Sequence, residues 1–336
     1  MTAYILKRLL LIPPMVLGIT LISFCMINLA PGAGTTPGGE GDLDASSKLT
    51  KDQIEILEKT FHVGQPIHIR YFLWLNDMLH GDFGPSVVTP SVPVLHKLRD
   101  ALPYSITIHI LVVFIVYMVS IPLGIHAAVR QNTLGERGIT VLLFVMYSLP
   151  SFWVAILLIK LMVWLHHHHY PSLGFQGIWP NNAEQLPTLT LLWEMTKNFF
   201  LPVLVSCYAG LASLSRFMRV GMIDIIRSDF IRTARAKGCS ERTVVLKHAL
   251  RNSLIPIVTL LAGMLPGLIG GSVIIETIFG IPGMGFLGYN AVLQRDYTVL
   301  MANFTLSAVL TLLGILMSDI LYVIVDPRIS FEKGTA

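Results

Sequence analysis

Six apolar windows, each long enough to cross a bilayer as a helix, constrain the fold of this chain more than any other feature. They cover residues 9–30, 102–129, 138–159, 198–215, 252–275 and 297–318. The hydrocarbon core of a membrane needs roughly 20 apolar residues in helical form. Only 13% of the 336 residues are charged, compared with about 25% in soluble domains. The sequence therefore predicts an all-α polytopic membrane protein with six transmembrane helices.

The first window follows Lys7 and Arg8 and has the general form of a secretory signal peptide. Its 22 uncharged residues exceed the roughly 7 to 15 that form the core of such a peptide. Pro31 would also stand just after the cleavage site, where it is poorly suited. We therefore interpret this window as a retained signal-anchor helix.

Lysine and arginine gather on one side of the windows when the N-terminus is placed in the cytoplasm. The loop 216–251 alone then brings nine of them to the inner side, whereas the short outer loops contain only Lys197 and Arg295. Short cytoplasmic loops are enriched in these residues, so the sequence predicts an N-in/C-in topology. Residues 1–101 then form the anchor helix and a long outer loop, and residues 102–336 form a five-span core.

The long outer loop contains two amphipathic helical patterns, at residues 50–61 and 66–79. The apolar face of the first comprises Ile54, Leu57 and Phe61, and that of the second comprises Tyr71, Trp74, Leu75 and Met78. Such faces beside a membrane are typical of an interfacial cap. Docking of an external protein is the alternative, because exposed apolar patches often mark interfaces.

The loop 216–251 has nine basic residues and only three acidic ones, and it contains two predicted helices. One face of the first helix is apolar and comprises Ile223, Ile226, Phe230 and Ala234. Gly238 is suited to end this helix, and Ser240 is suited to cap the next one, with Glu241 in its first turn. Two short helices that meet at a glycine form a compact projection able to enter a cleft in another protein. Binding to anionic headgroups explains the same residues equally well.

Two segments in this loop resemble the cytoplasmic loop of binding-protein-dependent ABC importer permeases. They are Arg232-Thr-Ala-Arg-Ala-Lys-Gly238 and His248-Ala-Leu-Arg-Asn252. Their form is that of the dipeptide, oligopeptide and nickel branch. The general family pattern begins Glu-Ala-Ala, which Arg232-Thr-Ala234 replaces here, and its later Leu-Pro is missing at the usual distance. Further matching segments are His80-Gly-Asp-Phe-Gly84, Tyr147-Ser-Leu-Pro-Ser-Phe-Trp153, Glu276-Thr-Ile-Phe-Gly-Ile-Pro-Gly-Met-Gly285 and Asp319-Ile-Leu-Tyr-Val-Ile-Val-Asp-Pro-Arg-Ile329.

The resemblance implies a type I ABC importer permease fold and a "B"-type subunit in the bacterial cytoplasmic (inner) membrane. It implies four further components: a second permease in a heterodimer, two ATPase subunits that bind ATP and Mg, and an extracytoplasmic substrate-binding protein. Residues 223–251 would couple this chain to an ATPase. The implied docking residues are Ile226, Phe230, Arg232, Thr233, Ala234, Arg235, Ala236, Lys237, Gly238 and Ser240. The implied substrates are dipeptides or oligopeptides, and nickel or antimicrobial peptides are alternatives within the same family.

The chain has no G-x-x-x-x-G-K-[ST] phosphate loop and no hydrolytic triad. We therefore expect a transport subunit and no enzyme, with the lipid bilayer as partner, no nucleic acid and no cofactor of its own. The four consecutive histidines at 166–169 do not predict a metal site, because consecutive residues point in different directions. An ion-coupled secondary transporter and a scaffold without transport are the competing function classes.

The fifth window is rich in residues that interrupt helices. They comprise Pro256, Gly263, Pro266, Gly267, Gly270 and Gly271. Such residues allow close helix packing, and they also form the hinges and broken helices that line transport paths. Glu276 and Asp319 lie near the ends of the fifth and sixth windows, where we expect structural capping or pairing.

Overall fold

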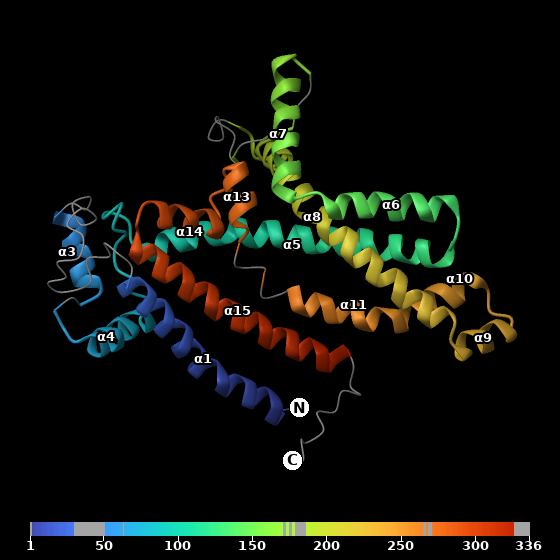
Figure 1. Ribbon diagram of the computed structural model, residues 1–336, viewed down its shortest axis with the longest axis horizontal. Coiled ribbons are helices and arrows are strands. Elements are labelled where there is room, and N and C mark those ends of the chain that lie inside the picture. Colours follow the sequence, from blue (N-terminus) through green and yellow to red (C-terminus); the bar gives the residue numbers. More distant parts are fainter. Residues whose placement is uncertain are drawn as a thin grey trace. The chain divides into compact units, whose positions relative to one another are not determined.

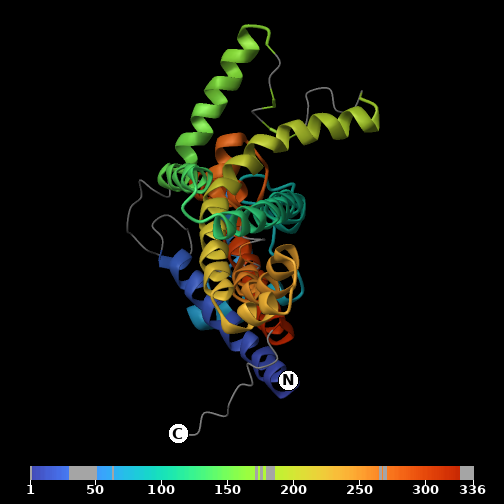
Figure 2. The same cartoon turned by 90° about the vertical axis from the view of Figure 1, so that its right-hand side faces the viewer.

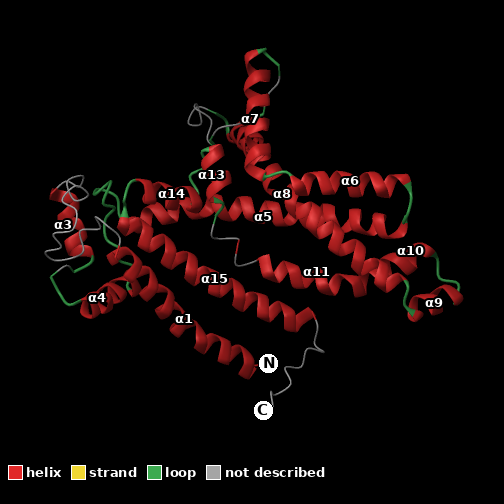
Figure 3. Ribbon diagram, viewed as in Figure 1, coloured by secondary structure: helices red, strands yellow, loops and turns green. Residues whose placement is uncertain are grey.

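The computed structural model describes residues 2–29, 51–62, 64–170, 173–174, 177–178, 186–264, 267 and 271–325. Within these ranges all regular elements are helices, as Figure 3 shows, which confirms the all-α class. The helices are α1 (Thr2–Leu29), α3 (Lys51–Thr60), α4 (Ile67–Leu79), α5 (Val94–Val129), α6 (Leu134–Ser148), α7 (Ser151–His167), α8 (Thr188–Ile226), α9 (Asp229–Ala236), α10 (Glu241–Thr243), the π-helix η2 (Val244–Ala249), α11 (Leu250–Met264), α13 (Val273–Phe279), α14 (Met284–Leu293) and α15 (Tyr297–Val325).

Three of these helices are long and apolar enough to cross a membrane, namely α5, α8 and the segment Tyr297–Ile320 of α15. The pair α6 and α7 forms a fourth span if the two bent helices are taken together. In α1 the stretch Leu9–Cys25, over which the side chains are described, is apolar. The part of the chain described here therefore has three or four spans by length and composition, and the count of six stays a prediction.

The third window is not one straight helix, so the prediction of a continuous helix over 138–159 is wrong. α6 ends at Ser148, α7 begins at Ser151, and their axes are bent by 96°. Leu149 adopts an extended conformation, with φ −89° and ψ 130°, as expected for a residue that precedes proline. The Tyr208 hydroxyl donates a hydrogen bond to the Leu149 carbonyl that the bend leaves without a helical partner. The bend at Pro150 is therefore held by α8.

The fourth window is longer than expected, and the fifth window is interrupted. α8 has 39 residues and continues through Pro202 without a break, so it extends beyond the predicted range 198–215 at both ends. The fifth window is interrupted, which agrees with the broken-helix interpretation, because Gly271 and Ser272 are not helical and α13 begins at Val273. Gly271 there adopts the left-handed conformation, with φ +68°, which L side chains rarely adopt.

The proline and glycine residues of the fifth window are the candidate hinge residues, and those that the structure describes lie before or within this interruption. Pro256 and Gly263 lie inside the helical run of α11, and Gly267 is also helical. Gly271 lies directly before the N-cap residue of α13. Pro266 and Gly270 lie outside the described residues.

The internal contacts divide the chain into two compact units. The first comprises Met1–Ile106 and Ile269–Leu313, and the second comprises Thr107–Leu268 and Gly314–Ala336. In Figure 1 the first unit holds the blue helices α1, α3 and α4 and the orange-to-red helices α13, α14 and the start of α15. The second unit holds α6 to α11, together with the later part of α5 and the end of α15.

The two amphipathic helices predicted in the outer loop are confirmed as α3 and α4, and they belong to the first unit. Their apolar faces pack into one cluster with α1 and the start of α15. This cluster comprises Phe24, Leu57, Phe61, Tyr71, Trp74, Leu75, Val87, Tyr297 and Met301. The Tyr71 hydroxyl lies 2.9 Å from the Thr20 hydroxyl and donates to the Leu17 carbonyl at 3.0 Å. α4 is therefore fixed to α1 by packing and by hydrogen bonds.

Glu276 lies in α13 of the first unit and is only 1% exposed. Its carboxylate accepts hydrogen bonds from the Ser105 hydroxyl at 2.8 Å and from the backbone amides of Ser272 and Phe286 at 3.1 and 3.0 Å. A Cβ atom at Gly283 would stand 2.5 Å from this carboxylate, so only glycine fits there without rearrangement. The structural role expected for Glu276 is confirmed. Asp319 lies half-buried within α15.

In the second unit α8 is the central helix and contacts α6, α7 and α11. Figure 2 shows α7 turned away from α6 and the first part of α8 extending beyond the other helices of this unit. An ion pair joins α6 to α8, because Arg219 lies 2.9 Å from the Glu136 carboxylate. Glu136 is only 5% exposed, and its carboxylate also accepts a hydrogen bond from Thr140 at 3.1 Å.

Candidate functional site

The basic segment between α8 and α11 forms a separate structural feature at one end of the second unit (Figure 1). α8 ends at Ile226, and the Ser228 hydroxyl donates to the Ile225 carbonyl at 2.6 Å. Ser228 is then the N-cap residue of α9, with Asp229 in the first turn. A negative side chain at this position interacts favourably with the helix dipole. The chain therefore turns sharply at Arg227–Ser228 and starts a new short helix.

The turn at the end of α9 has the predicted form. Lys237 is the C-cap residue, and Gly238 follows with φ +81°. The Gly238 amide donates to the Arg235 carbonyl, and the Cys239 amide donates to the Ala234 carbonyl at 3.2 Å. Glycine is the usual residue in this left-handed position because it has no Cβ. The role of Gly238 as the residue that ends the helix is confirmed.

Ser240 caps α10 as predicted, because its side chain accepts a hydrogen bond from the Thr243 amide. Glu241 lies in the first turn and forms a two-point contact with Arg235, at 2.6 and 3.3 Å. Hydrogen bonding to Arg235 lowers the pKa of the Glu241 carboxyl. The same hydrogen bond raises the pKa of the Arg235 guanidinium. The pair therefore bridges α9 and α10 across the glycine turn.

The apolar stripe predicted along 223–234 is not continuous, because the turn at Ser228 places Ile223 and Ile226 on α8 and the remaining members on α9. The inward face of α9 consists of Ile231, which is fully buried, and Ala234. Phe230 points away from this face and is 44% exposed. The sequence pattern missed Ile231, although its i, i+3 spacing to Ala234 is the signal that could have identified it.

The outward surface of the segment combines one aromatic side chain with several cationic ones. Of the predicted docking residues, six besides Phe230 are exposed side chains: Arg232, Thr233, Arg235, Ala236, Lys237 and Ser240. Ile226 is half-buried at the end of α8. This surface is suited to a partner that offers an apolar pocket with an acidic surround.

A π-helix, η2, joins α10 to α11 and contacts both α8 and α9. Val244 and Ala249 are fully buried in it, whereas Leu246 is exposed. π-helical turns are rare and often occur at functional sites. Residues 244–249 contain neither proline nor glycine, so no residue there predicts this change of helix type.

The histidines at 166–169 lie at the end of α7, where His168 is the C-cap residue. The side chains of Trp164 and His168 are close, with ring centroids 4.4 Å apart, and the His168 ring contacts the Trp164 carbonyl. Among the residues that the structure describes, no group of three or more His, Cys, Asp or Glu side chains is placed to hold a metal ion.

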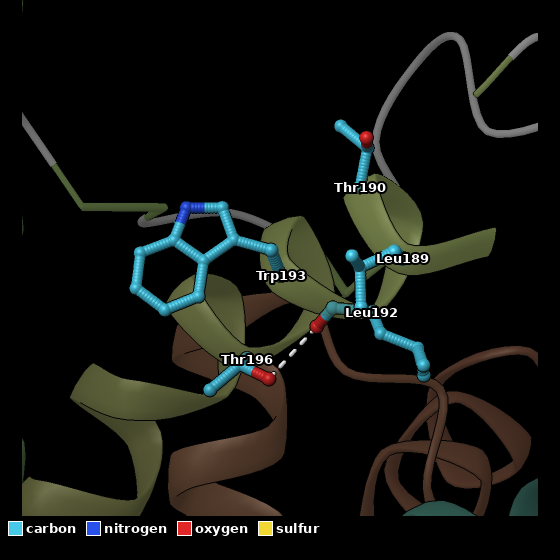
Figure 4. Close-up of a pocket in the computed structure, with 5 residues that line it drawn as sticks. All are labelled: Leu189, Thr190, Leu192, Trp193 and Thr196. Carbon is cyan, nitrogen blue, oxygen red and sulfur yellow. Dashed lines mark hydrogen bonds between the residues drawn. The ribbon is translucent and has the colours of Figure 1, made fainter. Parts of the chain in front are cut away.

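A shallow hollow lies on the first turns of α8 and is shown in Figure 4. It is lined by Leu189, Thr190, Leu192, Trp193 and Thr196. All five residues belong to one helix, and the Thr196 hydroxyl donates to the Leu192 carbonyl of that helix at 2.8 Å. The hollow therefore has the character of an open helix surface and does not define a substrate site.

The helical arrangement is that of an ABC importer permease. It is similar to the MetNI methionine ABC transporter in inward-facing conformations, with a TM-score of 0.52 over 68% of this chain and 96% of that chain. A second crystal form of the same transporter gives a TM-score of 0.51. The sequence identity to the first is 16%, so this likeness concerns the fold alone.

The chain belongs to the family of binding-protein-dependent transport system inner membrane components, whose sequence model matches residues 120–331. Three relatives match over nearly their full length. The oligopeptide transport system permease protein AppB of Bacillus subtilis (strain 168) is 37% identical over 98% of this chain and 100% of that protein. The dipeptide transport system permease protein DppB of Lactococcus lactis subsp. cremoris (strain MG1363) is 34% identical over 98% and 99%. The oligopeptide transport system permease protein OppB of Escherichia coli (strain K12) is 33% identical over 98% and 100%.

Proposed function

We propose that this chain is a permease subunit of an ATP-driven importer for dipeptides or oligopeptides. It crosses the bacterial cytoplasmic membrane six times, with both termini in the cytoplasm, and forms the transport path with a second permease. The names of the relatives AppB, DppB and OppB support the substrate class. Because the similarity extends over nearly the whole chain, it favours this function over an ion-coupled secondary transporter.

The observation that carries the coupling proposal is the two-sided structure of α9. Its inward face is fixed by the buried side chains of Ile231 and Ala234, and its outward face presents Phe230. A helix that is anchored on one side and exposes an aromatic residue on the other is suited to dock in a cleft. We assign that cleft to an ATPase subunit, which binds the ATP and Mg that this chain does not.

The proposed coupling depends on how α9 is connected to the spans. α9 contacts η2, which also contacts α8 and leads directly into α11. When two ATPase subunits close around ATP, displacement of α9 would therefore reach both α8 and α11. The extracytoplasmic binding protein delivers the peptide, and movement of the attached spans opens the path to each side in turn.

Gly238 provides the first test of this proposal. With φ +81°, this position tolerates asparagine better than other non-glycine residues. We expect Gly238→Trp to abolish co-purification of the ATPase chains from native membranes and to retain the second permease. Gly238→Asn, the matched control, should retain both. The measurement is mass spectrometry after gentle detergent extraction.

Two results would contradict the proposal. One is recovery of the ATPase chains with Gly238→Trp in the wild-type ratio, which would move the docking site elsewhere. The other is a wild-type chain that is recovered alone and transports substrate in liposomes down an ion gradient. That second result would establish the secondary transporter.

A further inference from the structure

The docking segment, which is α9 and α10 at residues 229–243, is joined to α11 by a turn that is wider than an α-helical turn. The Leu250 amide donates to the Val245 carbonyl, five residues earlier, whereas an α-helix joins residues four apart. Because such a π-turn holds more residues than an α-turn, it absorbs an extra residue in a helix that is otherwise α-helical. It therefore decides how the helix on one side is rotated relative to the helix on the other.

The buried face of this helix shows what the π-turn achieves. Four buried side chains lie along it, those of Val244, Ala249, Ser253 and Ile257. The last three are four residues apart, as expected for one face of an α-helix, but the first step is five residues. In an α-helix positions 244 and 249 would point about 140° apart. The π-turn therefore keeps Val244 on the buried face together with Ala249.

Two polar side chains hold the turn from the α11 side. The Asn252 side-chain amide donates to the His248 carbonyl at 3.1 Å. The Ser253 hydroxyl lies 3.0 Å from the Ala249 carbonyl and 3.1 Å from the Leu250 carbonyl, and it can donate to either. Where a helix changes from one hydrogen-bond pattern to another, carbonyls are left short of amide donors. Asn252 and Ser253 supply donors at this junction.

Ser253 also connects the turn to α8. Its hydroxyl lies 2.9 Å from the sulfur of Met222, and both residues are buried. Met222 stands about one turn before the end of α8 at Ile226, after which the chain enters the docking segment. η2 contacts α8 and α9 as well. Both connections of the docking segment to the long helices therefore meet at this turn.

We propose that η2 sets the rotation of the docking segment about α11, and that Asn252 and Ser253 are the positioning residues that hold it. If the turn relaxed to an α-helix with the same number of residues, the docking segment would rotate by about 100°, and Val244 would leave the buried face. The role of Asn252 and Ser253 in the turn stands on these contacts, and its consequence for ATPase binding rests on the proposed function.

The reactivity of a cysteine at position 244 measures this rotation. In a background without the native cysteines, Val244→Cys is labelled with a maleimide in the permease pair in nanodiscs. Because Val244 is fully buried, this cysteine should be protected. In the double variant Asn252→Ala with Ser253→Ala we expect labelling to become roughly tenfold faster, because the loss of two hydrogen bonds shifts the equilibrium between the two forms of the turn by about that factor.

Deletion of Lys247 separates a change of rotation from a general loss of stability. Lys247 is exposed within η2, and its removal shortens the first step along the buried face from five residues to four. An unbroken α-helix then keeps Val244 on the buried face without help from Asn252 and Ser253. Added to the double variant, the deletion should restore the protection of Val244→Cys. Lys247→Ala, the control for the lost side chain, should not restore it.

Binding of the purified ATPase subunits by the permease pair should follow the same order. We expect the double variant to lose roughly tenfold in affinity, and the added deletion to recover it. In the otherwise wild-type chain, deletion of Lys247 should keep ATPase binding. Insertion of one alanine after Lys247 should abolish it, because a step of six residues fits neither helix type. This last pair of variants tests the inference even if the double variant does not fold.

Two results would overturn the inference. One is a double variant in which Val244→Cys stays protected, and the other is an exposure of this cysteine that the deletion does not reverse. If the reactivity of the cysteine changes as expected while ATPase affinity is equal in all variants, η2 holds the rotation as inferred, and the ATPase contact proposed for α9 is wrong.

Discussion

Two neighbouring residues of α9 differ in burial and in the role that we propose for each. Ile231 is fully buried and Phe230 is 44% exposed, although both are large apolar residues in consecutive positions. Consecutive helical residues point about 100° apart, so one of the pair anchors the helix and the other is free to contact a partner. A substitution of Ile231 should therefore affect folding, whereas a substitution of Phe230 should affect docking.

We expect Phe230→Ala to weaken ATPase binding and peptide uptake while the chain remains folded. Removing an aromatic anchor from an interface costs about 2 kcal/mol or more, which corresponds to roughly a 30-fold loss of affinity. Ile231→Ala is the matched variant, and a buried deletion of this kind costs about 2–5 kcal/mol of folding free energy. ATPase binding by the purified permease pair and its thermal stability in detergent measure the two effects. Equal loss of stability in both variants would contradict this division of roles.

At the scale of elements, short polar contacts hold interrupted helices in place. The Tyr208 hydroxyl caps the open carbonyl of Leu149 at the bend between α6 and α7. The Glu136–Arg219 ion pair fixes the start of α6 to α8. Since α8 leads directly into the turn before α9, this ion pair would connect α6 to any movement of the proposed docking segment.

We expect Glu136→Gln to lower both thermal stability and uptake, because it leaves Arg219 without its buried counter-charge. Breaking a buried ion pair on one side costs about 3–5 kcal/mol, and the partial exposure of Arg219 reduces that figure. The double variant Glu136→Met with Arg219→Met should recover most of the stability. The exposed neighbour Arg137 provides a control, since Arg137→Gln should leave the Tm in detergent unchanged. Equal effects of Glu136→Gln and Arg137→Gln would show that the ion pair does not stabilise the unit.

At the scale of the whole molecule, the proposed function depends on topology. α3 and the segment 229–243 must lie on opposite sides of the membrane if the first faces the binding protein and the second faces an ATPase. The distribution of Lys and Arg favours this arrangement, and the similarity to permeases over nearly the full chain is consistent with it.

Cysteine labelling tests this topology directly. In a background without the native cysteines, Lys59→Cys should react with a membrane-impermeant maleimide in right-side-out vesicles. Lys237→Cys should react only after the membrane is permeabilised. Both native lysines are exposed in the structure, so a difference in reactivity reports the side of the membrane. The reverse pattern would rule out a cytoplasmic docking segment.

Much of the fold follows from local sequence properties. Apolar windows, the amphipathic patterns of α3 and α4, the left-handed glycine at 238 and the capping serine at 240 were all predicted, because each depends on residues within one or two turns. The helix break at Ser228 also has a local signal, since Ser228-Asp229 is a common helix start, but the apolar spacing continues across it and by itself predicts one stripe.

Other features depend on contacts between distant residues and have no local signal. The carboxylate of Glu276 is surrounded by donors from Ser105 and Phe286, which a single window does not reveal. Ile231 differs in part, because its i, i+3 spacing to Ala234 is a local signal for a shared face, whereas its burial follows from the contact of α9 with η2. Local spacing shows that a side chain shares a face with others, whereas burial depends on what the tertiary fold places against that face.

The sequence by itself determined that the protein is helical, that it is built for a membrane and to which family it is similar. Hydropathy over about 20 residues and local capping chemistry are sufficient for these conclusions. Only the tertiary structure decided that the third window is bent by 96°, that the break in the fifth window includes Gly271 and Ser272, and that α9 is anchored by Ile231. These outcomes depend on which side chains and carbonyls meet across the fold, and that information is not contained in any single segment.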